Sequence, residues 1–285
     1  MKGKSELLFR LKNSKFFVAG FVLSSLILIL SLISPYIIVF DTERTNLNES
    51  LNPPQFFSKG WSGHVLGTDY LGRDVLSRLL IGGKFSLQIS LTAVFWTALI
   101  GIITGLYSGY YGGVIDNLIM RFADIQLSIP PLLLAIAIVA VLGPNVTNLI
   151  IVLVITSWPY FARLVRGNVL VVREMDFVKS SIVLGANDSW IIFTQILPNI
   201  TTPIIIVSSQ RVGYMILMEA YLSFLGLGVQ PPTPSWGVMI SDGRHFISVA
   251  PWIILAPGIV LMMTVMSYNF IGDGLRDILD PKMKT

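Results

Sequence analysis

The sequence lacks cysteine altogether and contains only two histidines, His64 and His245. Without cysteine the chain has no disulfide framework, zinc–thiolate site or iron–sulfur cluster, and two histidines are too few for a histidine-rich metal site. Charged residues are also scarce, at 13%, against roughly 25% in an average soluble domain. This scarcity excludes a disordered chain and an ordinary soluble enzyme. The net charge of +4 is too small to indicate binding to nucleic acid.

Motifs of soluble catalysis are missing as well. The nearest match to a nucleotide-binding P-loop is Gly83-Lys84, but Phe85 stands in place of the hydroxyl residue and Arg78 in place of the first glycine. Neither a His-Glu-x-x-His motif nor a Gly-x-Ser-x-Gly motif is present. We therefore predict that the chain is not an enzyme and binds no metal or cofactor of its own.

Two further sets of polar residues are interpreted as structural. We predict that His64 and His245 are ordinary surface histidines. Asp69, Arg73 and Asp74 could be taken for catalytic carboxylates with an arginine, but aspartates in this spacing are typical of a turn followed by a helix cap.

Apolar residues, in contrast, make up 53% of the chain, and the mean hydropathy is +0.73. This composition predicts a polytopic membrane protein. Lipid leaves only helices and closed barrels as spanning structures, so long apolar runs predict an all-α fold. Six runs reach the length of about 20 residues that a spanning helix needs. They are residues 16–40, 85–111, 116–142, 146–166, 202–226 and 249–272.

The remaining segments predict how the chain is oriented. The first apolar run is longer than the 7–15 residues typical of a signal peptide, so we expect a retained helix. Thirteen Lys and Arg residues fall in the pieces predicted to be cytosolic, and six fall on the other side. The positive-inside rule then places both termini in the cytosol. The cytosolic pieces include 1–15, 167–200 and 273–285, and the extracytoplasmic pieces are 41–84 and 227–248.

Two patterns predict helix packing. Gly101, Gly105, Gly109 and Gly113 recur every fourth residue and form a stripe that lets another backbone approach closely. Packing against a helix of the same chain is the simpler interpretation, and a subunit interface is the alternative. Ile129-Pro130-Pro131 interrupts the third apolar run and predicts a kink.

The loop between the fourth and fifth runs contains a helix–turn–helix pattern. A short helix from Asp176 is predicted to end at Gly185, and Asn187, Asp188 or Ser189 can cap the next helix. That second helix is amphipathic and leads into Leu197-Pro198, where the next membrane helix begins. Its apolar face consists of Ile191, Ile192, Ile196 and Leu197. A pair of this size is compact enough to fit a cleft on a soluble partner.

This loop resembles the coupling loop of ABC importer permeases, the Glu-Ala-Ala motif. In the motif three residues separate the triplet from a Gly, and a Leu-Pro pair closes the frame, which corresponds here to Gly185 and to Leu197 and Pro198. Lys179, Ser180 and Ser181 occupy the triplet, so the spacing is intact while the usual acid is replaced by a lysine. The resemblance implies that these six residues couple the chain to an ATPase.

Other segments resemble the peptide/nickel importer permeases, in particular the second of their two permease subunits. These segments are 67–78, 219–228, 231–237 and 272–281. The resemblance implies a type I ABC importer permease fold in a bacterial or archaeal cell membrane. It also implies a second homologous permease, two ATPase subunits that bind ATP, and an extracytoplasmic substrate-binding protein.

The resemblance does not identify the cargo. Peptides are the favoured cargo, and nickel or a metal chelate is the alternative. A stand-alone secondary transporter or channel is the alternative of another class. Such proteins often show internal repeats, and none is evident in the sequence.

Two ionisable residues within an apolar run are candidates for the translocation pathway, because charge inside a membrane is costly. Arg211 and Glu219 lie eight residues apart, roughly 12 Å along a helix, so they cannot pair directly. Arg211 is predicted either to pair with another helix or to face the pathway, where it would favour a peptide carboxylate or an anionic chelate. Glu219 lies near the outer end of its helix, where a structural role is the alternative.

Overall fold

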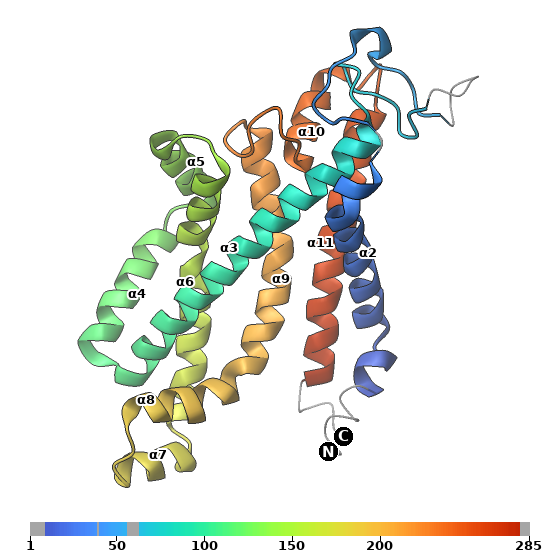
Figure 1. Cartoon of the computed structure of the whole chain (residues 1–285). Coiled ribbons are helices and arrows are strands. Elements are labelled where there is room, and N and C mark those ends of the chain that lie inside the picture. Colours follow the sequence, from blue (N-terminus) through green and yellow to red (C-terminus); the bar gives the residue numbers. More distant parts are fainter. Residues whose placement is uncertain (1–8, 39, 56–62, 280–285) are drawn as a thin grey trace.

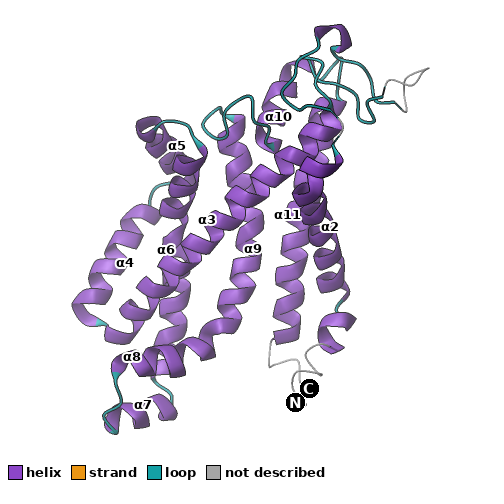
Figure 2. Ribbon diagram, viewed as in Figure 1, coloured by secondary structure: helices purple, strands orange, loops and turns teal. Residues whose placement is uncertain are grey.

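The structure, a computed structural model, describes residues 9–38, 40–55 and 63–279. Regular structure in this part of the chain is helical, without a β-strand (Figure 2). Five helices are long and apolar enough to cross a membrane, and a bent pair makes a sixth segment. The single helices are α2 (Lys15–Ile37), α3 (Val75–Tyr111), α6 (Val146–Arg173), α9 (Leu197–Phe224) with the turns that precede it, and α11 (Trp252–Leu279). The all-α, six-segment membrane fold predicted from the sequence is confirmed.

The helices extend beyond several of the predicted spans. α3 begins at Val75 rather than at residue 85, because Asp74 caps it by accepting a hydrogen bond from the Ser77 amide at 2.7 Å. α6 runs to Arg173 rather than ending at residue 166, and α11 runs to Leu279 rather than 272. Hydropathy marks only the part of a helix that suits lipid, whereas polar residues continue the same backbone hydrogen bonding outside it.

The third predicted span, 116–142, is not one straight helix. α4 (Gly113–Leu127) and α5 (Pro131–Leu142) meet at 91°. Pro131 occupies the first turn of α5, where its missing N–H is tolerated, so the chain starts a new helix instead of continuing the old one. The sequence predicted a kink here, and the structure shows a near right angle.

The bundle is built around α3, which crosses it diagonally and packs along α6 (Figure 1). The glycine stripe makes this contact possible. A Cβ added to Gly101, Gly105 or Gly109 would lie closer than 3.0 Å to atoms of α6, whereas Gly113 faces open space. The predicted packing within one chain is therefore confirmed at three of the four glycines. α11 packs between α2 and α9 and closes the other side of the bundle.

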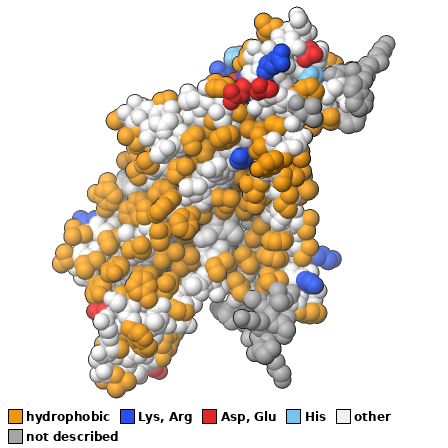
Figure 3. Space-filling model, in the orientation of Figure 1, with side chains coloured by type: hydrophobic (Ala, Val, Ile, Leu, Met, Phe, Trp, Pro, Cys, Tyr) orange, Lys and Arg blue, Asp and Glu red, His pale blue; other side chains and the backbone are white. Residues whose placement is uncertain are grey.

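The two ends of the bundle differ. One end, here called the loop end, carries residues 40–55 and 63–74 and α10 (Trp236–Gly243). The other, the α7 end, carries α7 (Asp176–Val183), α8 (Asp188–Trp190), the start of α2 and the end of α11 (Figure 1). Hydrophobic side chains cover most of the visible face between them, and charged side chains gather at the loop end (Figure 3). An exposed apolar belt of this kind suits lipid and neighbouring membrane subunits.

Candidate functional site

The helix–turn–helix predicted between the fourth and fifth spans is present at the α7 end. α7 is followed by Gly185, which has a φ of +77°. Glycine adopts this left-handed conformation without the steric cost that a side chain would add, so the chain can turn here. Asn187 then caps α8 by accepting a hydrogen bond from the Ser189 amide at 2.8 Å. A π-helical segment, Ile191–Ile196, connects α8 to α9, and α9 begins at the predicted Leu197-Pro198.

The inner face of this loop is fixed to the membrane helices. Ile191, Ile192 and Ile196 are buried, as predicted, in a cluster that includes Val165 and Val169 of α6. At the same point a hydroxyl of α3 reaches the loop, because Tyr110 donates a hydrogen bond to Asp188 at 2.7 Å. The loop is therefore in contact with α3 and α6 and continuous with α9.

The outer face of the loop is apolar and uncovered. Val183 and Leu184, at the tip of α7, are 86% and 85% exposed. Trp190 and Phe193 on the following helix are about half exposed. This tip projects beyond the bundle (Figure 1). Large apolar side chains exposed together in this way are typical of surfaces that other molecules cover.

The triplet that replaces Glu-Ala-Ala lies on α7. Lys179 forms an exposed ion pair with Glu174, with 2.9 Å between Nζ and Oε2, and this partner lowers the pKa of the Glu174 carboxyl. Ser181 accepts a hydrogen bond from Gln195 at 2.7 Å, which ties α7 to the π-helical segment. Ser180 is exposed. The coupling role of the triplet, like that of Gly185, Leu197 and Pro198, stays a prediction.

Arg211 lies on α9 where this helix faces α6. Its guanidinium carbon is 3.3 Å from the centroid of the Tyr160 ring and 4.8 Å from that of Tyr214. Within the described residues no carboxylate oxygen lies within 4.0 Å of its side-chain nitrogens. The predicted partner on another helix is thus an aromatic ring. No pattern in the sequence singles out Tyr160, because its contact with Arg211 depends on the register between α6 and α9.

Glu219, the second pathway candidate, is fully buried. Ser223, one turn along α9, donates a hydrogen bond to its Oε1 at 2.7 Å, while no hydrogen bond to Oε2 is formed by the described residues. A carboxyl group enclosed in this way does not line an open cavity of this chain. Its placement favours the structural alternative at the junction of α9 with the loop end.

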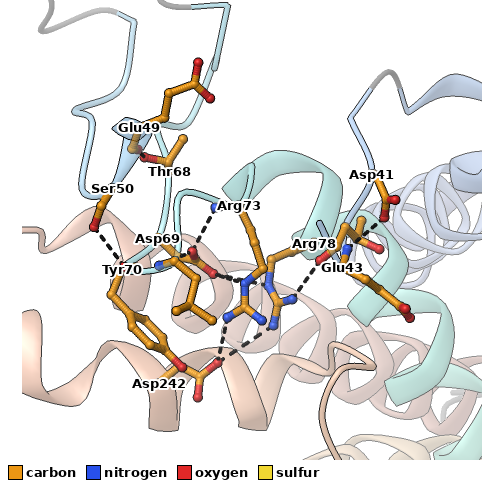
Figure 4. Close-up of polar contacts among 12 residues, drawn as sticks. Asp41, Glu43, Glu49, Ser50, Thr68, Asp69, Tyr70, Arg73, Arg78 and Asp242 are labelled. Carbon is orange, nitrogen blue, oxygen red and sulfur yellow. Dashed lines mark hydrogen bonds and ion pairs between the residues drawn. The ribbon is translucent and has the colours of Figure 1, made fainter. Parts of the chain in front are cut away.

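The turn-and-cap interpretation at the start of α3 is confirmed. Asp69 accepts hydrogen bonds from the Leu71 and Arg73 amides, both at 2.9 Å, and its Oδ2 lies 2.7 Å from Arg73 Nε. Arg73 and Arg78 also point toward Asp242 of α10, at 3.4 and 3.8 Å (Figure 4). Burial raises the pKa of the Asp242 carboxyl, and the two guanidinium groups oppose this in part. The cluster joins α10 to the start of α3.

The prediction that His64 is a surface residue is wrong. Its side chain is buried, with Nδ1 2.9 Å from Asp74 Oδ1 and Nε2 3.4 Å from Glu49 Oε2. The segment before α3 folds over the helix cap, and this tertiary contact has no local sequence signal. His245 is exposed as predicted. Among the described residues, no group of three His, Asp or Glu side chains could hold a metal ion.

Comparison with known proteins gives concordant results. Residues 101–285 match the family described as binding-protein-dependent transport system inner membrane component. The dipeptide transport system permease protein DppC of Alkalihalophilus pseudofirmus is 42% identical over 276 residues, which cover 97% of this chain and 89% of the relative. The glutathione transport system permease protein GsiD of Escherichia coli matches with the same identity and coverage.

Among solved structures, the chain is similar to a subunit in an inward-facing conformation of the MetNI methionine ABC transporter. The TM-score is 0.58 at 18% identity, and the match covers 71% of this chain and 97% of that one. At this identity the similarity concerns the fold alone.

Proposed function

The chain belongs to the family of binding-protein-dependent transport system inner membrane components, and from this premise we propose that it forms one membrane half of an ATP-driven importer of short peptides. The observation that carries the proposal is the similarity to permeases named for dipeptide and for glutathione transport, which extends over nearly the whole chain. Glutathione is itself a tripeptide, so the two cargoes share one chemical class. The helical, multi-pass architecture agrees with this role.

In this proposal the chain depends on partner proteins for the other half of the pathway, for ATP hydrolysis and for delivery of the cargo. A second, homologous permease completes the pathway, two ATPase subunits hydrolyse ATP, and an extracytoplasmic binding protein delivers the peptide. The loop from α7 to the start of α9 is the part that an ATPase contacts. Its exposed tip, Val183 and Leu184, offers a docking surface, and its inner face connects that surface to three membrane helices. Closure of the ATPases would thereby tilt α3, α6 and α9.

The sequence left two alternatives, one that concerns the cargo and one that concerns the class of transporter. Import of nickel or a metal chelate uses the same architecture, but no feature of the described residues favours it. A stand-alone transporter or channel does not account for the exposed apolar side chains at the tip of α7.

The docking role can be tested on two copies of the same tripeptide. Val183-Leu184-Gly185 forms the tip of α7, and Val141-Leu142-Gly143 ends α5 near the loop end, with both glycines at positive φ. We expect the double substitution Val183→Asn and Leu184→Asn to reduce the ATPase that co-purifies with the tagged chain about tenfold or more. Peptide uptake should fall in parallel. The matched variant, Val141→Asn with Leu142→Asn, should leave both unchanged.

Because Val183 and Leu184 are exposed, the thermal stability of the extracted chain should change by no more than about 0.5 kcal/mol. Equal ATPase recovery from both double variants would contradict the docking role. A wild-type complex that carries ATPases but imports no labelled di- or tripeptide would contradict the proposed cargo.

A further inference from the structure

Arg211 occupies the middle of a membrane-spanning helix. It stands midway between Leu197 and Phe224, the two ends of α9, with roughly 20 Å of helix on either side at 1.5 Å per residue. The hydrocarbon core of a bilayer is about 30 Å thick. An arginine within a membrane-spanning helix is costly, and Gln210 beside it contacts Asp273, just beyond the predicted span 249–272. Such residues face a bundle interior or a water-filled cavity and pair with another charge.

Among the described residues, no carboxylate pairs with this charge. Asp273 of α11 lies close by, because it accepts a hydrogen bond from Gln210, the residue before Arg211, at 3.2 Å. Its carboxylate oxygens are nevertheless more than 4.0 Å from the side-chain nitrogens of Arg211. A guanidinium group has five N–H donors, and none of those of Arg211 donates to another described residue. The contacts that it makes are with the faces of two aromatic rings.

This stacking leaves the donors available. A guanidinium group directs its N–H groups outward in its own plane, and that of Arg211 contacts Tyr160 through its central carbon, 3.3 Å from the ring centroid. That plane matches the two oxygens of a carboxylate in a bidentate fork. The stack also fixes the side chain in advance, so less rotamer freedom is lost when an anion binds.

The stack is also accessible. Arg211 is partly exposed, and Tyr160 is 43% exposed, so the pair lies on a surface at the seam between α6 and α9 rather than in the core. Tyr214, one turn along α9, is partly exposed as well. A ligand within the membrane complex can therefore approach the guanidinium from the open side of this seam.

We propose that Arg211, held by Tyr160 and Tyr214, is a subsite in the translocation pathway that binds the carboxylate group of the transported peptide. The inference rests on the proposed function and adds the chemical group that the membrane part recognises. Every unmodified peptide carries a C-terminal carboxylate, so one such subsite serves cargoes with different side chains. A free metal cation would be repelled by the same arginine.

The test compares a peptide that ends in a carboxylate with the same peptide ending in an amide. Uptake of both is measured with the complete complex in proteoliposomes, for the wild type, Arg211→Gln and Arg211→Lys. The binding protein has its own preference, but that preference is identical in all complexes. The change in the acid-to-amide uptake ratio between wild type and variant therefore isolates the coupling between Arg211 and the carboxylate.

We expect Arg211→Gln to lower the acid-to-amide ratio about tenfold, the loss of one charge-assisted hydrogen-bonded contact. Arg211→Lys keeps the charge but loses the planar fork, so its ratio should be intermediate. The control is Arg121→Gln, which removes an exposed arginine of α4 and should leave the ratio unchanged. Recovery of the ATPases with each variant reports assembly.

An unchanged ratio in Arg211→Gln overturns the inference, even where total uptake falls, because Arg211 then serves assembly or pairs with a group of the second permease. If Arg211→Gln does not assemble, the ratio of Arg211→Lys decides in the same way. A wild-type complex that takes up neither peptide contradicts the proposed function itself, which is a separate result.

Discussion

At the scale of single residues, the contact between α3 and α6 depends on side chains that are absent. Gly101 lies against Phe161 and the backbone of Trp158, so that an added methyl group would overlap both. Gly105 and Gly109 meet Ala162 and Val169 in the same way. In lipid, where apolar side chains gain little by leaving their solvent, close backbone approach of this kind supplies much of the attraction between helices.

A glycine-to-alanine substitution is therefore expected to change the stability of the chain in opposite directions at two positions. Gly101→Ala should destabilise the chain by about 1–3 kcal/mol, the usual cost of overpacking a close contact. Gly167→Ala, on α6, meets no atom within 4 Å and should stabilise by about 0.5–1 kcal/mol, because alanine loses less backbone entropy in a helix. Thermal unfolding in detergent measures both. If both variants were destabilised by the same amount, the close contact at Gly101 would not be the cause.

At the scale of elements, α10 is joined to the start of α3 through charge. Asp242 lies between Arg73 and Arg78, and its pKa is raised by burial. The folded chain therefore holds this proton more tightly than the unfolded chain, whose aspartate has a pKa of roughly 3.9. The stability that protonation contributes is present below that value and is lost as the pH rises through the higher pKa of the folded state.

The variant Asp242→Asn removes this pH dependence. We expect its stability, relative to the wild type, to be more favourable at pH 7 than at pH 4. Glu174→Gln provides a control of opposite sign, because the pKa of Glu174 is lowered by Lys179. Its stability relative to the wild type should be less favourable at pH 7. Thermal unfolding at the two pH values measures both variants, and the same trend in both would refute the assignment.

At the scale of the whole molecule, the open question is orientation. The distribution of Lys and Arg predicts that the α7 end faces the cytosol and that the loop end faces outward. The chain has no cysteine, so any introduced thiol is unique. Leu47, 71% exposed, lies in the segment at the loop end, and Phe9, 67% exposed, lies beside the end of α11.

We expect a membrane-impermeant thiol reagent to label Leu47→Cys in cells whose outer surface is accessible, and to label Phe9→Cys only in inside-out vesicles. Co-purification of the ATPases verifies that each variant is assembled. The reverse labelling pattern would show that the topology is the opposite of the predicted one. The α7 tip would then lie outside the cytosol and could not contact an ATPase there.

The sequence by itself determined the features that contiguous residues carry. Apolar runs located the six membrane segments, because the length of such a run must match the bilayer. Gly185 and the capping candidates Asn187, Asp188 and Ser189 located the turn in the loop before α9, because positive φ and helix capping are properties of single residues. The isoleucines from Ile191 to Ile196 identified its buried face through their spacing alone.

The tertiary structure decided what distant residues do together. It set the angle of 91° at Pro130-Pro131, buried His64 beneath the start of α3, and placed Asp242 beside Arg73 and Tyr160 beneath Arg211. These contacts join residues on different helices, and their partners follow from crossing angle and register, which no local pattern specifies. The same limit explains why Arg211 could be singled out in the sequence while the ring that holds it could not.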